Sequence, residues 1–331
     1  MKELIQKLVE TTGPSGYEDQ IRDLVKNQIS KFSKDIKVDP MGNLIVRMGA
    51  KKPGGSRIMI AAHMDEIGII VTHVDDNGFL RFTTIGGVRA ANCIGGRVKF
   101  LNGHSGVIYM EKMESADRVP SFEQLYIDCG YTSAKECPIK VGDIASFDRP
   151  FVDLGKRLVA KAMDDRIGVA VLVEVMRQLK NTPNEVFFVF STQEEVGIRG
   201  ATTSAFGIDP EIGLSVDVTP TGDTPKSMKM AVSLGNGPAI KVRDSGMLSD
   251  PRLVRHLVKI AEEKKLPYQL EVLEMGTTDA RAIQLTRSGV PAGCVSIPCR
   301  YVHSPSEMVD MDDVENAVKL ILAFLSEPIE L

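Results

Sequence analysis

Arg57-Ile58-Met59-Ile60-Ala61-Ala62 is apolar at every position after the first and shows no polar alternation. Such a run is typical of a strand that is buried on both faces, as in a sheet covered by helices on each side. Two further apolar runs, Glu185–Ser191 and 212–216, have the same character. These three segments predict the centre of an α/β sheet.

Helical patterns alternate with the predicted strands. Apolar residues at helical spacing predict one helix that ends before Gly13-Pro14 and a second that begins after Glu18. Further along the chain we expect helices over 166–179, 251–264, 279–288 and 312–325, and strands over 43–47, 268–273 and 291–297. This alternation predicts a doubly wound α/β fold, with a mixed sheet and helices on both of its faces.

The pattern changes between residues 67 and 153. Short β-rich pieces separated by Gly, Asn and Asp turns lie over 67–73, 79–83, 97–100, 106–110 and 144–147. The one segment with helical spacing lies over 121–127. This texture is typical of a small all-β unit. We therefore expect an α/β catalytic domain formed by residues 1–66 plus 154–331, with an inserted β-barrel-like domain over 67–153.

Composition excludes several classes of protein. The 331 residues are 43% hydrophobic and 25% charged, as in an ordinary globular chain, and the net charge of −4 provides no basic surface for nucleic acid. The apolar runs are too short to span a bilayer, and no secretory signal is visible. The five cysteines form no CxxC pair, so we expect free, mostly buried thiols in a reducing, cytoplasmic setting.

Histidines and carboxylates cluster where the predicted strands and helices meet. In open α/β sheets ligands bind beyond the carboxyl ends of the strands. Five such boundaries each carry a His or an acid: His63-Met64-Asp65-Glu66, Asp164-Asp165, Glu194-Glu195, Asp217 and His303. One alone is usually a turn or capping residue, but five at one sheet edge indicate a site. Imidazoles and carboxylates without thiolates fit one or two catalytic divalent ions such as Zn²⁺, Co²⁺ or Mn²⁺.

The spacing within each cluster suggests which role each of its residues has. Asp65 follows His63 by two residues, so we expect it to accept from the second ring nitrogen and fix the tautomer. In the two adjacent acid pairs, one member can bind metal while the other faces substrate, and the residues alone leave open which does which. His73, His104 and His256 lack this setting and are expected to be structural.

The ordered set of motifs resembles the co-catalytic metallo-aminopeptidase family of glutamyl aminopeptidases and tetrahedral (TET) aminopeptidases, a family also labelled endoglucanase-like. The resemblance runs from about residue 4 to 325, with Met163 where many members have Leu. The motifs are Thr12-Gly13-Pro14-Ser15-Gly16-Tyr17-Glu18, Ala61-Ala62-His63-Met64-Asp65-Glu66-Ile67-Gly68, Lys161-Ala162-Met163-Asp164-Asp165-Arg166, Thr192-Gln193-Glu194-Glu195-Val196-Gly197, Ser215-Val216-Asp217, Gly276-Thr277-Thr278-Asp279-Ala280 and Tyr301-Val302-His303-Ser304.

The resemblance implies a zinc-peptidase type of fold (phosphorylase/hydrolase-like) and a role for each site residue. Asp164 would bridge two divalent ions, Zn²⁺ or Co²⁺ and alternatively Mn²⁺. His63 and Asp217 would complete one metal site, while Glu195 and His303 complete the other. Glu194 would be the general base, with Asp65 behind His63, and a metal-bridging hydroxide would attack the peptide bond. The Asp164–Asp165 peptide bond would be cis.

The resemblance also implies substrates and assembly. Peptides with a free N-terminus would be the substrates, and neither nucleic acid nor a membrane would be a partner. The inserted β unit would serve dimerisation and substrate access, and dimers would assemble into a homo-oligomer, commonly a dodecamer. The preferred N-terminal residue stays open, although residues 276–280 are expected to form one wall of its pocket.

Other functions explain fewer of these residues. A metal-dependent deacylase of acylated amino acids or peptides would use the same metal core, because fold does not fix function. A glycosidase could use Glu194 and Glu195 as its carboxylate pair, but His63 and His303 would then have no role. A non-catalytic assembly shell would require a missing ligand, and Gly103-His104-Ser105-Gly106 lacks the spacing of a nucleophilic serine motif.

Overall fold

The main body of the molecule is an eleven-stranded mixed sheet, seen in a computed structural model that describes residues 1–113, 118–329 and 331. Its central strands are parallel, with β3 (Arg57–His63) between β12 (Glu185–Ser191) and β13 (Ile212–Thr219), and β16 (Ala292–Arg300) beside β13. The strands follow the order β1 (Ile36–Val38), β2 (Leu44–Met48), β12 (Glu185–Ser191), β3 (Arg57–His63), β13 (Ile212–Thr219), β16 (Ala292–Arg300), β17 (Glu307–Asp310), β11 (Arg157–Ala160) and β10 (Val152–Asp153), with β14 (Ala239–Arg243) and β15 (Gln269–Val272) attached beside β16.

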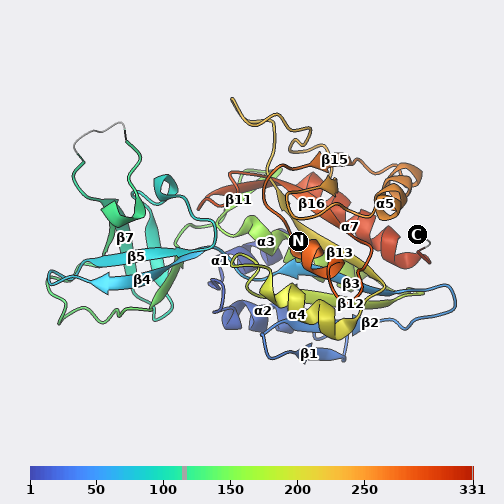
Figure 1. The fold of residues 1–331 in the computed structure, drawn as a ribbon, viewed down its shortest axis with the longest axis horizontal. Coiled ribbons are helices and arrows are strands. Elements are labelled where there is room, and N and C mark those ends of the chain that lie inside the picture. Colours follow the sequence, from blue (N-terminus) through green and yellow to red (C-terminus); the bar gives the residue numbers. More distant parts are fainter. Residues whose placement is uncertain (114–117, 330) are drawn as a thin grey trace.

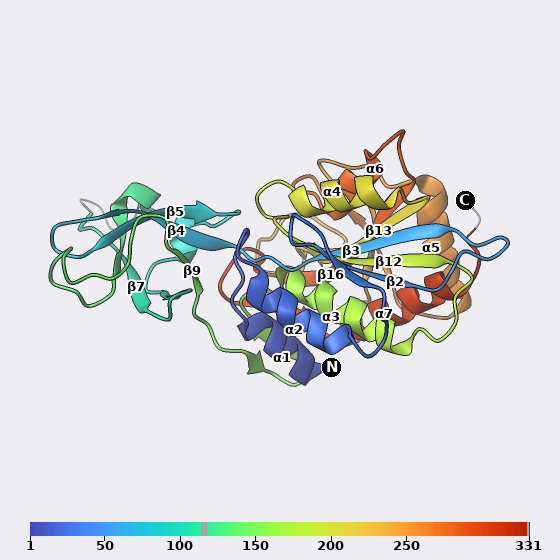
Figure 2. The ribbon, with the colours of Figure 1, turned by 90° about the horizontal axis from the view of Figure 1, so that it is seen from below.

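Helices cover both faces of this sheet, so the prediction of a doubly wound mixed α/β fold is confirmed. One face carries α1 (Lys2–Glu10), α2 (Asp19–Ile29), α3 (Met163–Gln178) and α7 (Met311–Ser326), as Figure 2 shows. The opposite face carries α4 (Arg199–Ile208) and α6 (Asp279–Gln284). Helix α5 (Pro251–Glu263) packs against α7 and β14.

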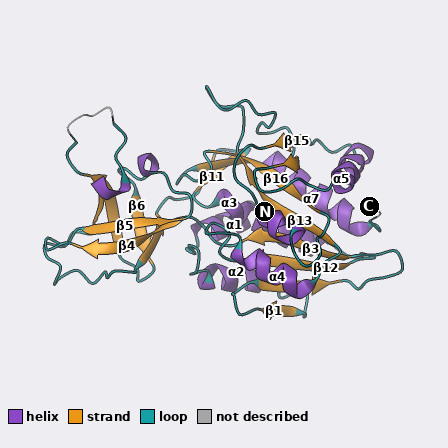
Figure 3. Ribbon diagram, viewed as in Figure 1, coloured by secondary structure: helices purple, strands orange, loops and turns teal. Residues whose placement is uncertain are grey.

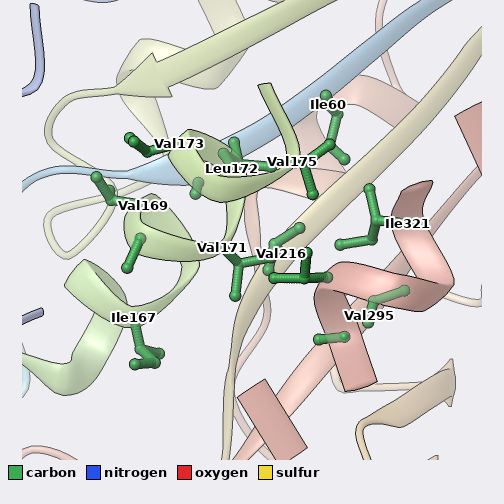
Figure 4. Packing of buried hydrophobic residues seen from close by; sticks show 14 of the residues in the cluster. Ile60, Ile167, Val169, Val171, Leu172, Val173, Val175, Val216, Val295 and Ile321 are labelled. Carbon is green, nitrogen blue, oxygen red and sulfur yellow. The ribbon is translucent and has the colours of Figure 1, made fainter. Parts of the chain in front are cut away.

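The core is centred on α3. Every residue from Met163 to Met176 is buried, because α3 packs against β3 and β13 on one side and against α1, α2 and α7 on the others. Figure 4 shows Val171 beside Val216 of β13, with Ile321 of α7 and Val295 of β16 close by. A helix that is apolar all round is stable only in such a setting. The core therefore fixes the start of α3, which carries Asp164 and Asp165, against the sheet.

A second, separate unit is a closed six-stranded antiparallel barrel, which lies to the left of the main sheet in Figures 1 and 3. Its apolar core is distinct from that of the main sheet. The barrel order is β4 (Gly68–Val74), β5 (Leu80–Ile85), β8 (Leu125–Asp128), β7 (Ser105–Met110), β6 (Arg97–Phe100) and β9 (Ile144–Phe147). The expected small all-β unit is thus present.

Several elements differ from the sequence-based expectation. The segment over 121–127, where helical spacing was the signal, forms a single 3-10 turn at Phe122–Gln124 followed by strand β8, because Leu125 and Ile127 alternate into the barrel core. Helix α4 was not predicted, since Gly200, Gly207 and its threonines disfavour helix and packing on the sheet decides instead. The short strands β1, β10, β11, β14 and β17 were also missed.

Two smaller expectations can be checked in the same structure. All five cysteines are free, and Cys93, Cys294 and Cys299 are buried, as expected. Among the residues that the structure describes, no helix combines the length and apolar character needed to cross a membrane.

Candidate metal centre and active site

The predicted site residues converge at one edge of the main sheet. His63 is the last residue of β3 and lies in register with Ser191, the last residue of β12, so Glu194 and Glu195 follow at the same edge. Asp217 lies near the end of β13. Asp164 comes from the first turn of α3, and His303 from the turn after β16. All five clusters that were predicted at the boundaries of strands and helices therefore lie at one edge of the sheet.

Asp164 lies at the centre of two groups of potential metal ligands. Its Oδ1 lies 3.0 Å from Nε2 of His63, and its Oδ2 lies 3.2 Å from Nε2 of His303. Asp217 joins the first group, with Oδ1 4.0 Å from Nε2 of His63. Glu195 joins the second, with Oε2 3.2 Å from Nε2 of His303. Within each group the ligand atoms lie within 4.8 Å of one another.

These separations fit divalent ions. Ligand atoms bound at about 2.0 Å in a tetrahedral zinc site lie about 3.3 Å apart. The donor set of imidazole and carboxylate, without thiolate, suits Zn²⁺, Co²⁺ or Mn²⁺. The five predicted ligands therefore lie close enough together to hold metal, and their role stays a prediction: His63, Asp164, Glu195, Asp217 and His303.

Glu194 belongs to neither group, although it precedes Glu195 and its Oε2 is as far from Nε2 of His63 as Oδ1 of Asp217 is. Its Oε2 lies 4.0 Å from Nε2 of His63, and its side chain is 12% exposed. The two glutamates therefore face different positions in the site, as expected for an adjacent pair. The role of Glu194 as the general base stays a prediction.

Asp65 connects His63 with the glutamate pair, but not entirely as expected. The nearest acceptor for Nδ1 of His63 is the backbone carbonyl of Asp65, at 3.1 Å, whereas its carboxylate lies 3.4 Å away. The carboxylate instead accepts the backbone N–H groups of Glu194 and Glu195, at 3.0 and 3.1 Å. Its Oδ2 also accepts the hydroxyl of Ser15 at 2.6 Å. Asp65 thus orients two parts of the site at once.

Three further buried acids contact the site, and the sequence predicted none of these contacts. Asp165, joined to Asp164 by the expected cis peptide bond, accepts the backbone N–H of His63 at 3.2 Å. Glu307 accepts the backbone N–H groups of Asp164 at 3.0 Å and His303 at 2.8 Å. Asp279, the first residue of α6, accepts the hydroxyl of Ser191. The sequence offered a signal for Asp165, as a member of an acid pair, and for Asp279, within the segment 276–280 expected to line the pocket, but none for Glu307.

The site holds more carboxylates than the described cations can neutralise. Burial raises the pKa of most of these acids, because desolvation penalises the charged form and neighbouring carboxylates add to the effect. This set comprises Asp165, Glu194, Glu195, Asp217, Asp279 and Glu307. Burial opposes charge on His63 and His303 too, but hydrogen bonds with Asp164 raise the pKa of both imidazoles above the ordinary value. Bound cations would provide the missing positive charge.

Comparison with known proteins supports this assignment. Residues 42–320 match the family model described as M42 glutamyl aminopeptidase. The lysyl aminopeptidase of Pyrococcus furiosus is 35% identical over 98% of this chain and 96% of its own. The structure of aminopeptidase APDkam598 from Desulfurococcus kamchatkensis superposes with a TM-score of 0.94 at 43% identity, covering 98% of this chain and 94% of that one.

A second similar structure is that of the Pyrococcus horikoshii TET1 peptidase, a protein described as assembling into a tetrahedron or a large octahedral shell. That chain is 34% identical, with a TM-score of 0.88 and coverage of 98% of this chain and 99% of its own. The family match spans more than half of the chain, and the resemblance inferred from the motifs is confirmed. The chain therefore belongs to the M42 glutamyl aminopeptidase family and is an aminopeptidase, a metal-dependent hydrolase of peptide bonds.

Proposed function

We propose that the chain removes N-terminal residues from peptides at a two-metal centre. The observation that carries this proposal is the position of Asp164, whose two oxygens face His63 and His303 at 3.0 and 3.2 Å. A carboxylate shared between two ligand groups can hold two cations at once. His63 and Asp217 complete one site, and Glu195 and His303 complete the other.

Bound Zn²⁺, Co²⁺ or Mn²⁺ supplies Lewis-acid polarisation of the scissile carbonyl and lowers the pKa of water. Glu194 takes the proton of the attacking water on its carboxylate and passes it to the leaving amine. Such general acid–base catalysis typically contributes about 10²–10⁴-fold to the rate. Burial is the chief cause that raises the pKa of Glu194 above its ordinary value, and a raised pKa makes the carboxylate a stronger base for this proton.

The domain organisation belongs to the same proposal. We infer that residues 1–66 plus 154–331 form the catalytic domain and that 67–153 form an insert for dimerisation. Val107 and Tyr109 on β7 support this role, because their exposed fractions are 44% and 50% on the outside of the barrel. Dimers joined in this way would build a larger homo-oligomer such as a dodecamer. Light scattering coupled to gel filtration would then report a mass that is an even multiple of 36.1 kDa.

The decisive experiment compares free and blocked substrates. A panel of aminoacyl p-nitroanilides, each free and N-acetylated, is assayed after chelation and after adding back Co²⁺ or Zn²⁺. We expect metal-restored cleavage of the free forms only, and their ranking identifies the preferred N-terminal residue. Cleavage of the acetylated forms would indicate a deacylase, and activity that ignores chelation would contradict the two-metal mechanism.

A further inference from the structure

The N-terminal motif Thr12–Glu18 contacts the loop that carries Glu194 and Glu195. Gly13 and Pro14 run alongside Glu66, with the backbone N–H of Glu66 donating to the carbonyl of Gly13 at 3.1 Å and Pro14 forming a parallel bridge with Glu66. The motif then turns at Gly16, whose φ of +86° is readily adopted by glycine. Glu18 follows immediately before α2 and is 5% exposed.

Three successive backbone N–H groups of the catalytic loop are each held by a buried carboxylate. Oε1 of Glu18 accepts the N–H of Gln193 at 3.0 Å. Oδ1 and Oδ2 of Asp65 accept those of Glu194 and Glu195 at 3.0 and 3.1 Å. Gln193 has a φ of 55°, in the left-handed region that non-glycine residues seldom adopt. The loop therefore depends on these acceptors to keep a conformation that its own sequence does not favour.

Among the described residues Glu18 forms no ion pair, and the buried Arg166 acts on its carboxyl only at longer range. Its carboxyl accepts the backbone N–H groups of Gly16, at 2.8 Å, and of Gln193, at 3.0 Å. A buried acid with no ion pair adds little to stability, since its desolvation is not offset by an opposite charge. The position of Glu18 is instead explained if it holds the loop in place. The N–H groups of Gly16 and Gln193 need an acceptor oxygen, which does not have to carry a charge.

We propose that Glu18 is a positioning residue that holds Gln193 so that the carboxylate of Glu194 points at the substrate. The inference rests on the proposed role of Glu194 as the base. A displacement of about 1 Å in a catalytic group can lower the rate about 100-fold. Loss of the Glu18 acceptor is therefore expected to lower kcat about 10–100-fold while KM changes little, because substrate contacts elsewhere are untouched.

The test uses two substitutions at Glu18 that differ in the acceptor. Glu18→Gln keeps the oxygen that accepts both N–H groups, so it should retain near-normal kcat. Glu18→Met fills a similar volume but cannot accept these bonds, so it should show the loss in kcat. Glu3→Gln, at an exposed acid in α1, is the matched surface control and should behave as the unmodified protein. Equal losses in Glu18→Gln and Glu18→Met would overturn the positioning role.

A structural readout is independent of activity. Hydrogen–deuterium exchange of the metal-free protein should show faster exchange in the peptide covering residues 190–198 for Glu18→Met, but not for Glu18→Gln. The other segments should keep their protection if the variant is folded. Unchanged exchange in this peptide would contradict the proposal that Glu18 holds the loop. Loss of protection throughout the protein would show that Glu18 is needed for folding instead.

A double-mutant cycle separates this inference from the proposed function. If Glu18 acts through Glu194, then Glu18→Met should lower kcat little further in a Glu194→Gln background. If Glu194→Gln alone keeps normal turnover, the proposed base is wrong. If Glu194→Gln abolishes turnover while Glu18→Met is silent, the base stands and the positioning role of Glu18 is wrong.

Discussion

Gly87 lies so close to the imidazole of His303 that a Cβ built on Gly87 would stand 2.4 Å from Nδ1 of the histidine. Gly87 belongs to the turn that leaves β5 of the barrel, whereas His303 belongs to the main sheet's candidate metal centre. Asn92, in the same segment between β5 and β6, donates from Nδ2 to the backbone carbonyl of His303 at 3.3 Å. The segment between β5 and β6 of the barrel thus contacts one of the two ligand groups directly.

This contact predicts that Gly87→Ala weakens the second metal site. The added methyl must displace the imidazole of His303, while His63 and Asp217 are left in place. Perturbing groups that support a metal ligand typically costs about 10–100-fold in affinity or activity. We expect the purified variant to keep one ion instead of two after dialysis, measured by atomic emission. Gly207→Ala, where a Cβ meets nothing within 4 Å, is the control. Two ions retained by Gly87→Ala would contradict this reading.

The shared position of Asp164 predicts an unequal effect of removing ligands. Asp164→Ala removes an oxygen from both groups, so both ions should be lost. His63→Ala and His303→Ala each disturb one group, so each should leave one ion. Metal content per subunit, measured at a fixed free metal concentration, checks this order. If Asp164→Ala retained as much metal as the histidine variants, Asp164 would not be a bridge.

Glu194 is predicted to matter for turnover and not for metal. Glu194→Gln keeps the size of the side chain and removes only its ability to take a proton. We expect kcat to fall by about 10²–10⁴-fold with both ions still bound. Activity and metal content measured on one preparation test the two halves together. A fall in activity that is matched by lost metal would make Glu194 a ligand instead of a base.

Much of this site could be predicted from the sequence because the physics is local. Continuous apolar runs such as 58–62 mark strands buried on both faces, and the acids and histidines that follow them must meet at one sheet edge. Glu307 and Asp279 could not be found in this way. They act on backbone N–H groups and a hydroxyl that only the folded chain brings near, and no spacing in the sequence announces such contacts.

The same limit applies to the fold. Helix α4 contains Gly200 and Gly207, so its local preference is poor and its packing against β12 and α6 decides its structure. Strand β8 was not predicted because the spacing of its few apolar residues fits both the period of a helix and that of a strand. The contact between Gly87 and His303 joins residues more than 200 positions apart, which no local pattern can reveal.

The pKa shifts predict that the metal-free protein becomes less stable as pH rises from about 5 to 8. Acids whose folded pKa is raised bind protons that the unfolded chain has released above about pH 4, so stability falls with rising pH. His63 and His303, whose pKa values are also raised, act in the same direction. Their contribution is full below about pH 6.5 and is lost as pH passes the folded value. The lowered pKa of Asp164 has the opposite sign, but that contribution is already complete above about pH 4.

Metal should reverse this trend, because ligands must lose their protons before they bind. We expect the rise in Tm on adding Co²⁺ to the chelated protein to grow from pH 5.5 to pH 7.5. Differential scanning fluorimetry at matched ionic strength measures it, with Asp164→Ala as the control that should show little rise. A Tm shift that is the same at every pH would mean that the titrating groups are not the ligands.

A buried ion pair beside the site predicts the largest loss of stability from a single charge. Lys241 on β14 is 1% exposed and pairs with Glu271 on β15, while Oδ2 of Asp244 lies 3.7 Å from its Nζ. Lys241→Met leaves both carboxylates without a cation, and breaking a buried pair in this way typically costs about 3–5 kcal/mol. Adding Glu271→Gln removes one unpaired charge, so the double variant should be more stable than Lys241→Met alone.

Lys259→Met is the surface control for this prediction, since the side chain of Lys259 is 71% exposed. It should change the free energy of unfolding by less than about 0.5 kcal/mol. Denaturant unfolding of the metal-free proteins gives the three values, and a double variant no more stable than Lys241→Met would show that the carboxylates are not the source of the loss.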